Sequence, residues 1–172
     1  MAKSSTLKAK NLSFIKILTM KGKHKERQKE RETMRHWLVK SEPFKYSWAQ
    51  LLKDKRTFWD GVRNYQARNN LQAMKKGDHV LFYHSNEELA VVGVAVVVKE
   101  AYQDPTTEDV RWVAVDIEPL ETLKTSVTLD EMKQEERLQN IALIRQSRLS
   151  VMPLNKEEFA LIAAKGREKR EK

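Results

Sequence analysis

Short apolar segments alternate with polar ones through the middle of the chain, a pattern typical of β-strands joined by turns and short helices. Residues 91–98 contain no polar side chain, which predicts a central strand covered on both faces. In the last apolar segment, valine and isoleucine alternate with Ala114, Asp116 and Glu118, which predicts a strand with one face exposed to solvent. The segments that predict strands are residues 36–40, 79–84, 89–99 and 111–118.

Capping residues mark the expected helix starts. Ser47, Thr128 and Asn155 each stand three positions before a Gln or Glu, the spacing of a capping box, and predict three helices. A further short helix is expected at residues 68–74 and a connector at residues 151–154. The strands are too irregularly spaced for a doubly wound βαβ array, so the pattern predicts a single mixed α+β domain with a curved sheet or small barrel.

The two ends of the chain differ from this body in composition. Residues 1–33 contain ten Lys or Arg and no sustained apolar period, so we expect a basic, disordered extension there, a domain at residues 34–164 and a charged tail at residues 165–172. The preferred interpretation of the extension is an over-long start, with Met34 as the natural first residue. A secretory signal is disfavoured, because Lys16 interrupts its apolar segment and no small-x-small cleavage pattern follows.

Composition excludes several classes of protein. The chain has no cysteine, which rules out disulfide frameworks, thiolate zinc sites and thiol catalysis and suits a cytoplasmic protein, or a nuclear one in a eukaryote. No apolar run approaches the roughly 18 residues that would span a membrane. The net charge is +9, but residues 35–76 contain ten basic and three acidic side chains, whereas residues 77–136 contain four and fourteen. Only a local basic surface is therefore expected to meet phosphate groups.

Sequence templates of catalytic and metal sites are absent. There is no Gly-rich phosphate loop, no His-Glu-x-x-His and no Gly-x-Ser-x-Gly, and the four histidines lack metal-ligand spacing, so we expect neither a metal nor a cofactor. His84 precedes Ser85, but adjacent strand residues point to opposite sides, which places His84 poorly for activating this serine. Asp60 is the stronger candidate acid or base, although Asp-Gly is first a turn signal.

Residues 58–70 combine three aromatic side chains with two arginines and four amides. Buried amides and guanidinium groups require partners, so this mixture is poor core material and good ligand-site material. Aromatic rings stack on nucleobases, Asn and Gln pair with base edges, and Arg binds phosphate. The alternative is that Phe58 and Trp59 are core residues and that Arg63 and Arg68 belong to a solvated surface.

Eight segments together resemble the EVE domain, over residues 34 to about 164. The resemblance implies membership of the PUA-like superfamily, beside the ASCH and YTH domains, and hence a partly closed β-barrel flanked by short helices. It also implies a noncatalytic module that binds modified bases in DNA or RNA. The segments are residues 37–43, 46–48, 59–69, 77–78, 82–86, 92–93, 102 with 104–105, and 148–151.

The same resemblance implies a pocket for one base, bordered by the end of the first strand and by a tryptophan. By similarity, the expected pocket residues are Val39, Lys40, Ser41, Glu42, Trp59, Asp60, Asn64, Tyr83 and His84. The expected phosphate-binding rim consists of Arg63, Arg68, Arg145 and Arg148.

The preferred hypothesis is a monomeric, noncatalytic module that binds DNA or RNA through a modified base stacked on Trp59. Replacing Trp59 with alanine is expected to abolish binding with little loss of fold. Two alternatives remain open: an enzyme that acts on a base or nucleotide with Asp60 or His84 as general acid or base, and a PUA-like domain that binds a small ligand or a protein. The other tryptophans, Trp37, Trp48 and Trp112, are interpreted as core residues.

Overall fold

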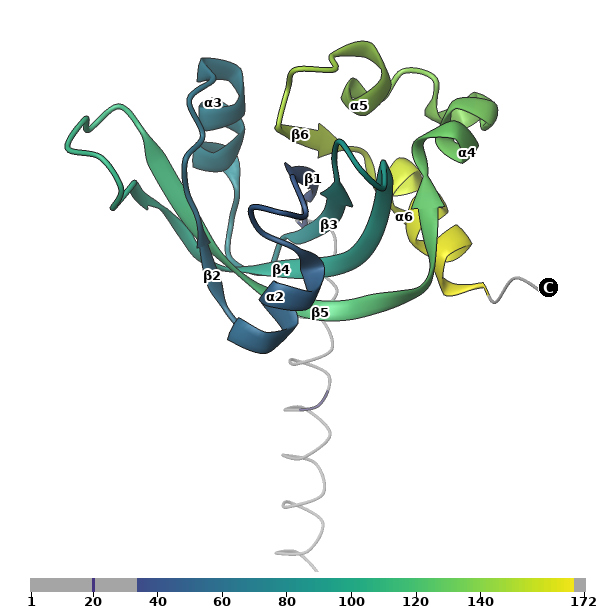
Figure 1. Ribbon diagram of the computed structural model, residues 1–172, viewed down its shortest axis with the longest axis horizontal. Coiled ribbons are helices and arrows are strands. Elements are labelled where there is room, and N and C mark those ends of the chain that lie inside the picture. Colours follow the sequence, from purple (N-terminus) through teal and green to yellow (C-terminus); the bar gives the residue numbers. More distant parts are fainter. Residues whose placement is uncertain (1–19, 21–33, 169–172) are drawn as a thin grey trace, which may run out of the picture. The chain divides into compact units, whose positions relative to one another are not determined.

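An open six-stranded sheet organises the part of the chain that this computed structural model describes, which is Met20 and residues 34–168 (Figure 1). The strand order is β2-β5-β4-β3-β1-β6; β1 and β3 are parallel, and the other neighbouring strands are antiparallel. The sheet bends but does not close, because β2 and β6 stand at opposite edges. This arrangement confirms the expected mixed α+β fold. The strands are β1 (His36–Ser41), β2 (Thr57–Trp59), β3 (His79–His84), β4 (Ala90–Gln103), β5 (Val113–Thr128) and β6 (Val151–Leu154).

Short helices pack around the sheet, and three of them begin at the predicted capping residues. The Ser47 hydroxyl accepts a hydrogen bond from the Gln50 N–H, and Thr128 and Asn155 form complete capping boxes, which satisfy N–H groups at the helix starts. No helix in the described residues is long and apolar enough to cross a membrane. The helices are α2 (Trp48–Asp54), α3 (Tyr65–Ala73), α4 (Leu129–Gln134), α5 (Ala142–Arg145) and α6 (Lys156–Arg167), with a 3-10 turn at Glu136–Leu138.

The chain divides into two units, Met1–Met34 and Arg35–Lys172. Apart from Met20, the extension expected at residues 1–33 lies outside the described residues. The last helix extends past the boundary expected at Ala164, because α6 continues to Arg167. Gly166 is buried against Leu123, and Arg167 forms an ion pair with Glu121 at 2.7 Å. Residues 165–167 are therefore part of the folded domain.

Two elements differ from their predictions because long-range pairing or local capping decides them. Residues 151–154 are strand β6, paired with β1, and not a connector. Pro153 has no N–H to donate, but β6 is an edge strand, where a proline is tolerated. Helix α3 begins at Tyr65 instead of Arg68, since the Asn64 side chain accepts a hydrogen bond from the Ala67 N–H at 2.9 Å.

The prediction of a solvent-exposed face on β5 is wrong at its first positions. Ala114 is fully buried and Asp116 is only 9% exposed. The Asp116 carboxylate accepts hydrogen bonds from Arg56 Nη2 at 2.7 Å and from the Tyr102 hydroxyl at 2.5 Å. A carboxylate with such partners can be buried at low cost, so an aspartate in this strand did not indicate a solvent-exposed face.

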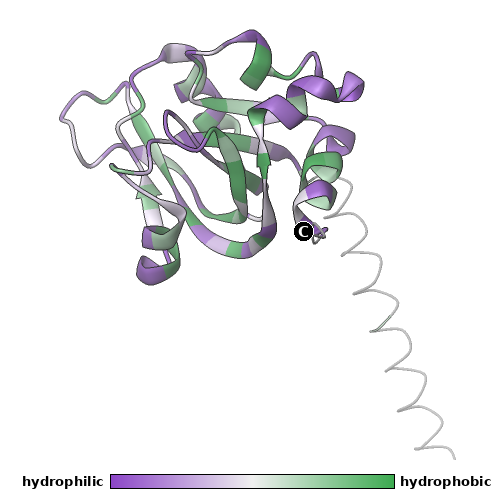
Figure 2. Ribbon diagram, turned by 45° about the vertical axis from the view of Figure 1, so that its right-hand side comes forward, coloured by the Kyte–Doolittle hydropathy of each residue, from purple (hydrophilic) through white to green (hydrophobic). Residues whose placement is uncertain are grey.

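The core lies between the bent sheet and the helices, where Figure 2 shows hydrophobic residues concentrated on the strands. The expectation that Trp37, Trp48 and Trp112 are buried is confirmed. Trp37 Nε1 donates to Asp78 Oδ2 at 2.8 Å, Trp48 Nε1 donates to Thr122 Oγ1 at 2.9 Å, and Trp112 is hydrogen-bonded to Asp109. Each of these three indoles thus has an internal partner.

Two histidines beneath α6 predict a pH-dependent stability. The rings of His36 and His79 lie 6.2 Å apart, and both contact Phe159. Burial lowers the pKa of each; the neighbouring His79 and Lys156 lower that of His36 further, and Arg167 lowers that of His79, against weaker opposing effects of Asp78 and Glu157. Folding therefore favours the neutral rings.

This contribution to stability is present above the ordinary histidine pKa of 6.5 and is lost as the pH falls below it. We expect the melting temperature to fall by a few degrees between neutral pH and about pH 5. The double variant His36→Gln/His79→Gln should show a flatter profile over the same range in thermal melts. A parent protein with no loss of stability below pH 6.5 would contradict the expectation.

Candidate functional site

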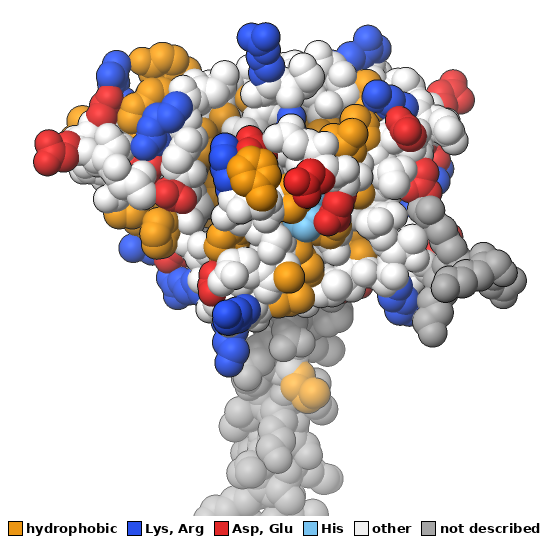
Figure 3. Space-filling view, viewed as in Figure 1, with side chains coloured by type: hydrophobic (Ala, Val, Ile, Leu, Met, Phe, Trp, Pro, Cys, Tyr) orange, Lys and Arg blue, Asp and Glu red, His pale blue; other side chains and the backbone are white. Residues whose placement is uncertain are grey.

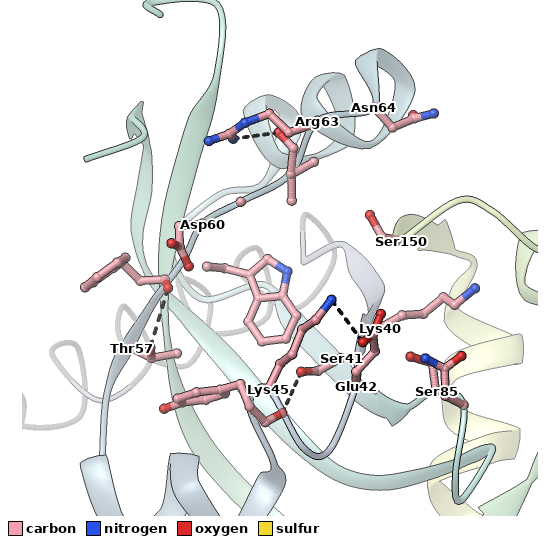
Figure 4. A pocket seen from close by; sticks show the side chains of 16 residues that line it. Lys40, Ser41, Glu42, Lys45, Thr57, Asp60, Arg63, Asn64, Ser85 and Ser150 are labelled. Carbon is pink, nitrogen blue, oxygen red and sulfur yellow. Dashed lines mark hydrogen bonds and ion pairs between the residues drawn. The ribbon is translucent and has the colours of Figure 1, made fainter. Parts of the chain in front are cut away.

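A cavity of about 740 Å³ opens at the end of β1 where the chain turns toward α2 (Figure 4). Five stretches of sequence line it: the end of β1 with the following turn, strand β2, the β2–α3 loop, the β3–β4 turn and the residue before β6. Its lining residues are Lys40, Ser41, Glu42, Lys45, Tyr46, Thr57, Phe58, Trp59, Asp60, Gly61, Val62, Arg63, Asn64, Ser85, Asn86 and Ser150. We call this cavity the central pocket.

A tight turn after β1 forms one wall of the central pocket. The N–H groups of Lys45 and Tyr46 both donate to the Glu42 carbonyl, at 2.9 and 3.0 Å. The Ser41 hydroxyl donates to the Tyr46 carbonyl at 2.5 Å, and an ion pair of 3.0 Å joins Lys45 to Glu42 (Figure 4). These closed contacts hold the turn in one conformation, so the polar groups at the end of β1 are preorganised.

Trp59 forms another wall and is the last residue of β2. It pairs with Val115 of β5, and its ring packs edge-on against Phe82, with centroids 5.4 Å apart. Unlike the other three tryptophans, it has an indole N–H without a hydrogen-bond partner among residues 34–168. No buried side-chain nitrogen or oxygen of the described residues lacks a partner, so this N–H is accessible from the pocket that Trp59 lines.

The structure corrects the expectation that Trp59 can be truncated with little effect on the fold. Trp59 is 8% exposed and belongs to the hydrophobic core. Truncating a buried tryptophan to alanine costs about 3–5 kcal/mol. A binding test must therefore keep an aromatic ring at this position.

The β2–α3 loop is held by a carboxylate to which sequence reasoning assigned no role. Asp104 is fully buried, and its Oδ2 accepts hydrogen bonds from the Gly61 N–H at 3.0 Å and from Arg63 Nη1 at 2.7 Å. Its Oδ1 accepts from the N–H and the hydroxyl of Thr106, at 2.8 and 2.6 Å. Burial would raise the pKa of Asp104, but these hydrogen bonds outweigh it and lower the pKa to about 2.

Gly61, at the bend of this loop, has φ +70°, a left-handed conformation that glycine adopts without strain. The Asp104-Pro105 pair lies within a segment that resembles the EVE domain, but nothing in its spacing indicates that it binds a loop some 40 residues earlier in the chain. Arg63 is thus engaged with Asp104 and is a structural element of the pocket wall rather than a free phosphate ligand.

Besides Arg63, four charged side chains line the central pocket. Lys40 Nζ donates to the Ser147 carbonyl at 2.5 Å, and burial lowers the pKa of Lys40. Glu42 is paired with Lys45. The Asp60 carboxylate lines the pocket and forms no hydrogen bond or ion pair within the described part of the chain. The pocket therefore offers a hydrogen-bond donor on Trp59 and a free acceptor on Asp60.

Six of the nine residues expected to form the pocket line it. Val39 does not line it, because this residue is 1% exposed and belongs to the hydrophobic core. Asn64 lines the pocket, but its side-chain oxygen is engaged as the α3 cap. The predicted residues that line the pocket are Lys40, Ser41, Glu42, Trp59, Asp60 and Asn64.

Tyr83 and His84 do not line the central pocket, which corrects that part of the prediction. Tyr83 is 1% exposed, and burial raises its pKa to about 12. His84 Nε2 accepts from the Trp48 N–H at 3.0 Å, so Nδ1 bears the proton that is donated to Glu88 Oε2 at 2.9 Å. With both ring nitrogens engaged, His84 positions α2 and is unavailable as a general acid or base at the pocket.

The predicted basic rim divides between paired and unpaired arginines. Arg68 lies over the Tyr65 ring and donates to Asn69. Arg145 and Arg148 line a second, smaller cavity beside the central pocket. No group of three or more His, Cys, Asp or Glu is arranged to hold a metal ion over Met20 and residues 34–168.

Folding also brings together the two oppositely charged halves of the body. Ion pairs join Arg56 to Asp116 and Arg63 to Asp104, each at 2.7 Å, and Lys75 to Glu100 at 3.2 Å. Figure 3 shows basic and acidic side chains interspersed over the face viewed. Part of the basic block is therefore neutralised, and a phosphate-binding surface depends on the individual cations that remain unpaired.

Comparison with known proteins gives a consistent result. The model of the EVE domain matches residues 35–165. Thymocyte nuclear protein 1 of Gallus gallus is 38% identical over 168 residues, which cover 78% of this chain and 69% of that protein. The human protein of the same name is 37% identical over 161 residues, which cover 74% and 72%.

Solved structures extend the similarity to the fold. Rpa0253 from Rhodopseudomonas palustris is 44% identical, with a TM-score of 0.74, and the match covers 77% of this chain and 93% of that one. Human THYN1, solved in complex with 5-methylcytosine containing DNA, is 35% identical with a TM-score of 0.72, and the match covers 79% and 99%. The sequence match spans all but the last turn of the described domain, and the same fold accompanies it; the chain belongs to the EVE domain family.

Proposed function

We propose that this protein binds DNA that contains a modified cytosine and holds the modified base, chemically unchanged, in the central pocket beside Trp59. The observation that supports this function most directly is the accessible indole of Trp59, whose N–H has no partner among residues 34–168. The similarity to human THYN1, which was solved with 5-methylcytosine containing DNA, supports the class of ligand.

The pocket has the size and the chemistry for one base. Its volume of about 740 Å³ falls within the usual range for small-molecule sites. An aromatic face stacks on a base with a gain of about 1–3 kcal/mol, and the Trp59 N–H can donate to a ring nitrogen or carbonyl oxygen of a pyrimidine. A base inside a duplex cannot reach such a pocket, so the nucleotide must be extruded from the stack.

The polar groups favour cytosine over thymine. A carboxylate accepts a hydrogen bond from the N4 amino group of cytosine, and Asp60 offers an acceptor that forms no other interaction in the described part of the chain. Thymine presents a carbonyl oxygen at the same place, which would face the carboxylate unpaired and therefore be disfavoured. A 5-methyl group adds about 0.8 kcal/mol of apolar burial.

The test is the substitution Trp59→Phe, which keeps an aromatic ring and removes the N–H. We expect the affinity for a DNA oligonucleotide containing 5-methylcytosine to fall about five- to tenfold, because one hydrogen bond contributes about 1 kcal/mol. Fluorescence anisotropy at constant salt measures the dissociation constant for oligonucleotides that contain 5-methylcytosine, cytosine or thymine at one position. The preference for 5-methylcytosine over thymine should decrease in the variant, because the ring nitrogen N3 accepts a hydrogen bond in cytosine and carries a proton in thymine.

The matched control is Trp37→Phe, which removes an indole N–H that donates to Asp78 outside the pocket. This variant should lose some thermal stability and keep the affinity of the parent. Equal binding by the parent and by Trp59→Phe would overturn the pocket assignment. Mass spectrometry of the recovered oligonucleotide separates binding from catalysis, because an enzyme with Asp60 as acid or base would alter the mass.

A further inference from the structure

We propose that the second cavity, beside the central pocket, binds the phosphodiester group that adjoins the held base. This inference rests on the proposed function and adds a distinct subsite for the DNA backbone. The cavity has a volume of about 270 Å³. We call it the arginine cleft, because Arg145 and Arg148 line it together with the polar side chains of Asn64, Gln66, Gln146 and Ser147.

The charged side chains that line the arginine cleft are all positive. Its lining contains two arginines and no acidic side chain, whereas the central pocket contains Glu42 and Asp60. Ion pairs neutralise Arg56, Arg63 and Lys75 elsewhere in the body, whereas no lining residue of the cleft compensates the charge of its two arginines. The central pocket also has basic lining residues, Lys40, Lys45 and Arg63, so its charges are mixed. An anion is therefore favoured in the arginine cleft, whose lining carries positive charge alone.

The two arginines differ in how they are held. Arg145 is oriented by its own neighbours, since Nε donates to the Gln139 carbonyl at 3.0 Å and Nη2 donates to Asn140 Oδ1 at 3.2 Å. Arg148 forms no hydrogen bond or ion pair with any residue that the structure describes. A fixed guanidinium beside a free one suits a phosphate, because a guanidinium group matches the geometry of two phosphate oxygens.

The cleft adjoins the central pocket directly. Asn64 lines both cavities. The segment between them is tied to the end of β1: Lys40 Nζ donates to the Ser147 carbonyl, and the Lys40 N–H donates to the Ser150 carbonyl at 2.9 Å. Figure 4 shows Lys40, Ser150 and Asn64 along the same side of the pocket, opposite Thr57 and Asp60. A nucleotide whose base enters the central pocket thus has its phosphate on the side of the arginine cleft.

The amide and hydroxyl groups fit the same ligand. Phosphate oxygens accept hydrogen bonds from Asn, Gln and Ser side chains as well as from arginine, and such contacts fix the register of a nucleic-acid strand without selecting a base. The structure therefore assigns selectivity to the central pocket and strand positioning to the arginine cleft. Arg63 and Arg68, the other arginines of the predicted rim, are engaged with Asp104 and with Tyr65 and Asn69.

The experiment combines Arg148→Ala with a neutral backbone linkage. A methylphosphonate replaces the phosphodiester on the 5′ side or on the 3′ side of a single 5-methylcytosine, and dissociation constants are measured for parent and variant. We expect one of the two neutral linkages to weaken binding by the parent about tenfold, as does Arg148→Ala with the native linkage. Together, the two changes should weaken binding little more than either alone, because they remove the same contact.

Salt dependence gives a second measurement. The slope of log affinity against log salt concentration should fall by about 0.7 to 0.9 in Arg148→Ala, the value for one lost phosphate contact. The preference for 5-methylcytosine over cytosine should be the same as in the parent. Arg35→Ala is the matched control, since Arg35 is also exposed and lies at the opposite end of β1 from Lys40; it should change neither the affinity nor the response to methylphosphonate.

Two results would overturn the inference: additive effects of Arg148→Ala and the neutral linkage, or no effect of either linkage on the parent. The same measurements distinguish these results from those expected if the proposed function itself were wrong. If the central pocket were assigned wrongly, Trp59→Phe would leave base preference intact while the Arg148 coupling persisted. If only the cleft were assigned wrongly, base preference would depend on Trp59 while the coupling was absent.

Discussion

Gly93→Ala is expected to destabilise the domain by about 3 kcal/mol, near the upper end of the cost of overpacking a core. Gly93 is the fourth residue of β4, and a Cβ added there would overlap the Trp48 ring at Cε2 and Cζ2. Trp48 cannot move away freely, because its indole donates to Thr122 and packs against Phe82. Chemical unfolding in urea measures the loss.

The cause of this loss can be tested by shortening the ring that the new methyl group meets. Trp48→Phe alone should also destabilise, since it removes buried atoms and a hydrogen bond. The double variant Gly93→Ala/Trp48→Phe should be more stable than the sum of the two single effects predicts, because the clash is absent. Full stability of Gly93→Ala, or additive effects, would contradict the close packing of Trp48 on β4.

Asp104→Asn is expected to destabilise the fold by about 2–4 kcal/mol, the range for a buried carboxylate that loses its charged partner and part of its hydrogen bonds. An amide nitrogen does not accept hydrogen bonds. In one orientation the asparagine would lose the bonds from Gly61 and Arg63, and in the other it would lose those from Thr106. Because these bonds hold the β2–α3 loop, which lines the central pocket, the affinity for the modified oligonucleotide should fall as well. Thermal unfolding and binding measurements test the two effects separately.

The destabilisation caused by Asp104→Asn should depend on pH, in a direction that follows from the pKa of Asp104. The folded-state pKa of Asp104 is about 2, below the ordinary aspartate value of 3.8, so its contribution to stability is present above pH 3.8 and is lost as the pH falls toward 2. The difference in stability between the parent and Asp104→Asn should therefore shrink over that range. Glu108→Gln is the control, because Glu108 is an exposed residue of the same loop whose side chain forms no ion pair within the described part of the chain, and it should have little effect.

Much of the fold could be predicted because its signals are local. Strand β3 was predicted at its observed bounds, and the caps at Ser47, Thr128 and Asn155 form as expected. A capping hydrogen bond spans three residues and an apolar alternation spans six to eight, so a short window of sequence contains the whole interaction. Strand β6 was missed because its four residues are a strand only through their pairing with β1.

The candidate site was predicted in part. Residues 58–64 contribute Trp59, Asp60 and Asn64 to the pocket, and the mixture of aromatic and polar side chains marked them as unsuited to a core. Tyr83 and His84 were expected there by similarity to the EVE domain. The structure buries both, since β3 lies in the interior of the sheet between β1 and β4.

The sequence by itself determined four of the six strands, the helices that follow Ser47, Thr128 and Asn155, the absence of cysteine chemistry and the segment that contains Trp59. Each of these depends on residue type or on neighbours a few positions apart. Only the tertiary structure decided which polar groups are free. Asp104 binds a loop far from it in sequence and so pairs with Arg63, while the Trp59 N–H and the Arg148 guanidinium are left without hydrogen-bond partners among residues 34–168. Hydrogen-bond partners are set by distance in space, and in a bent sheet that distance does not follow position along the chain.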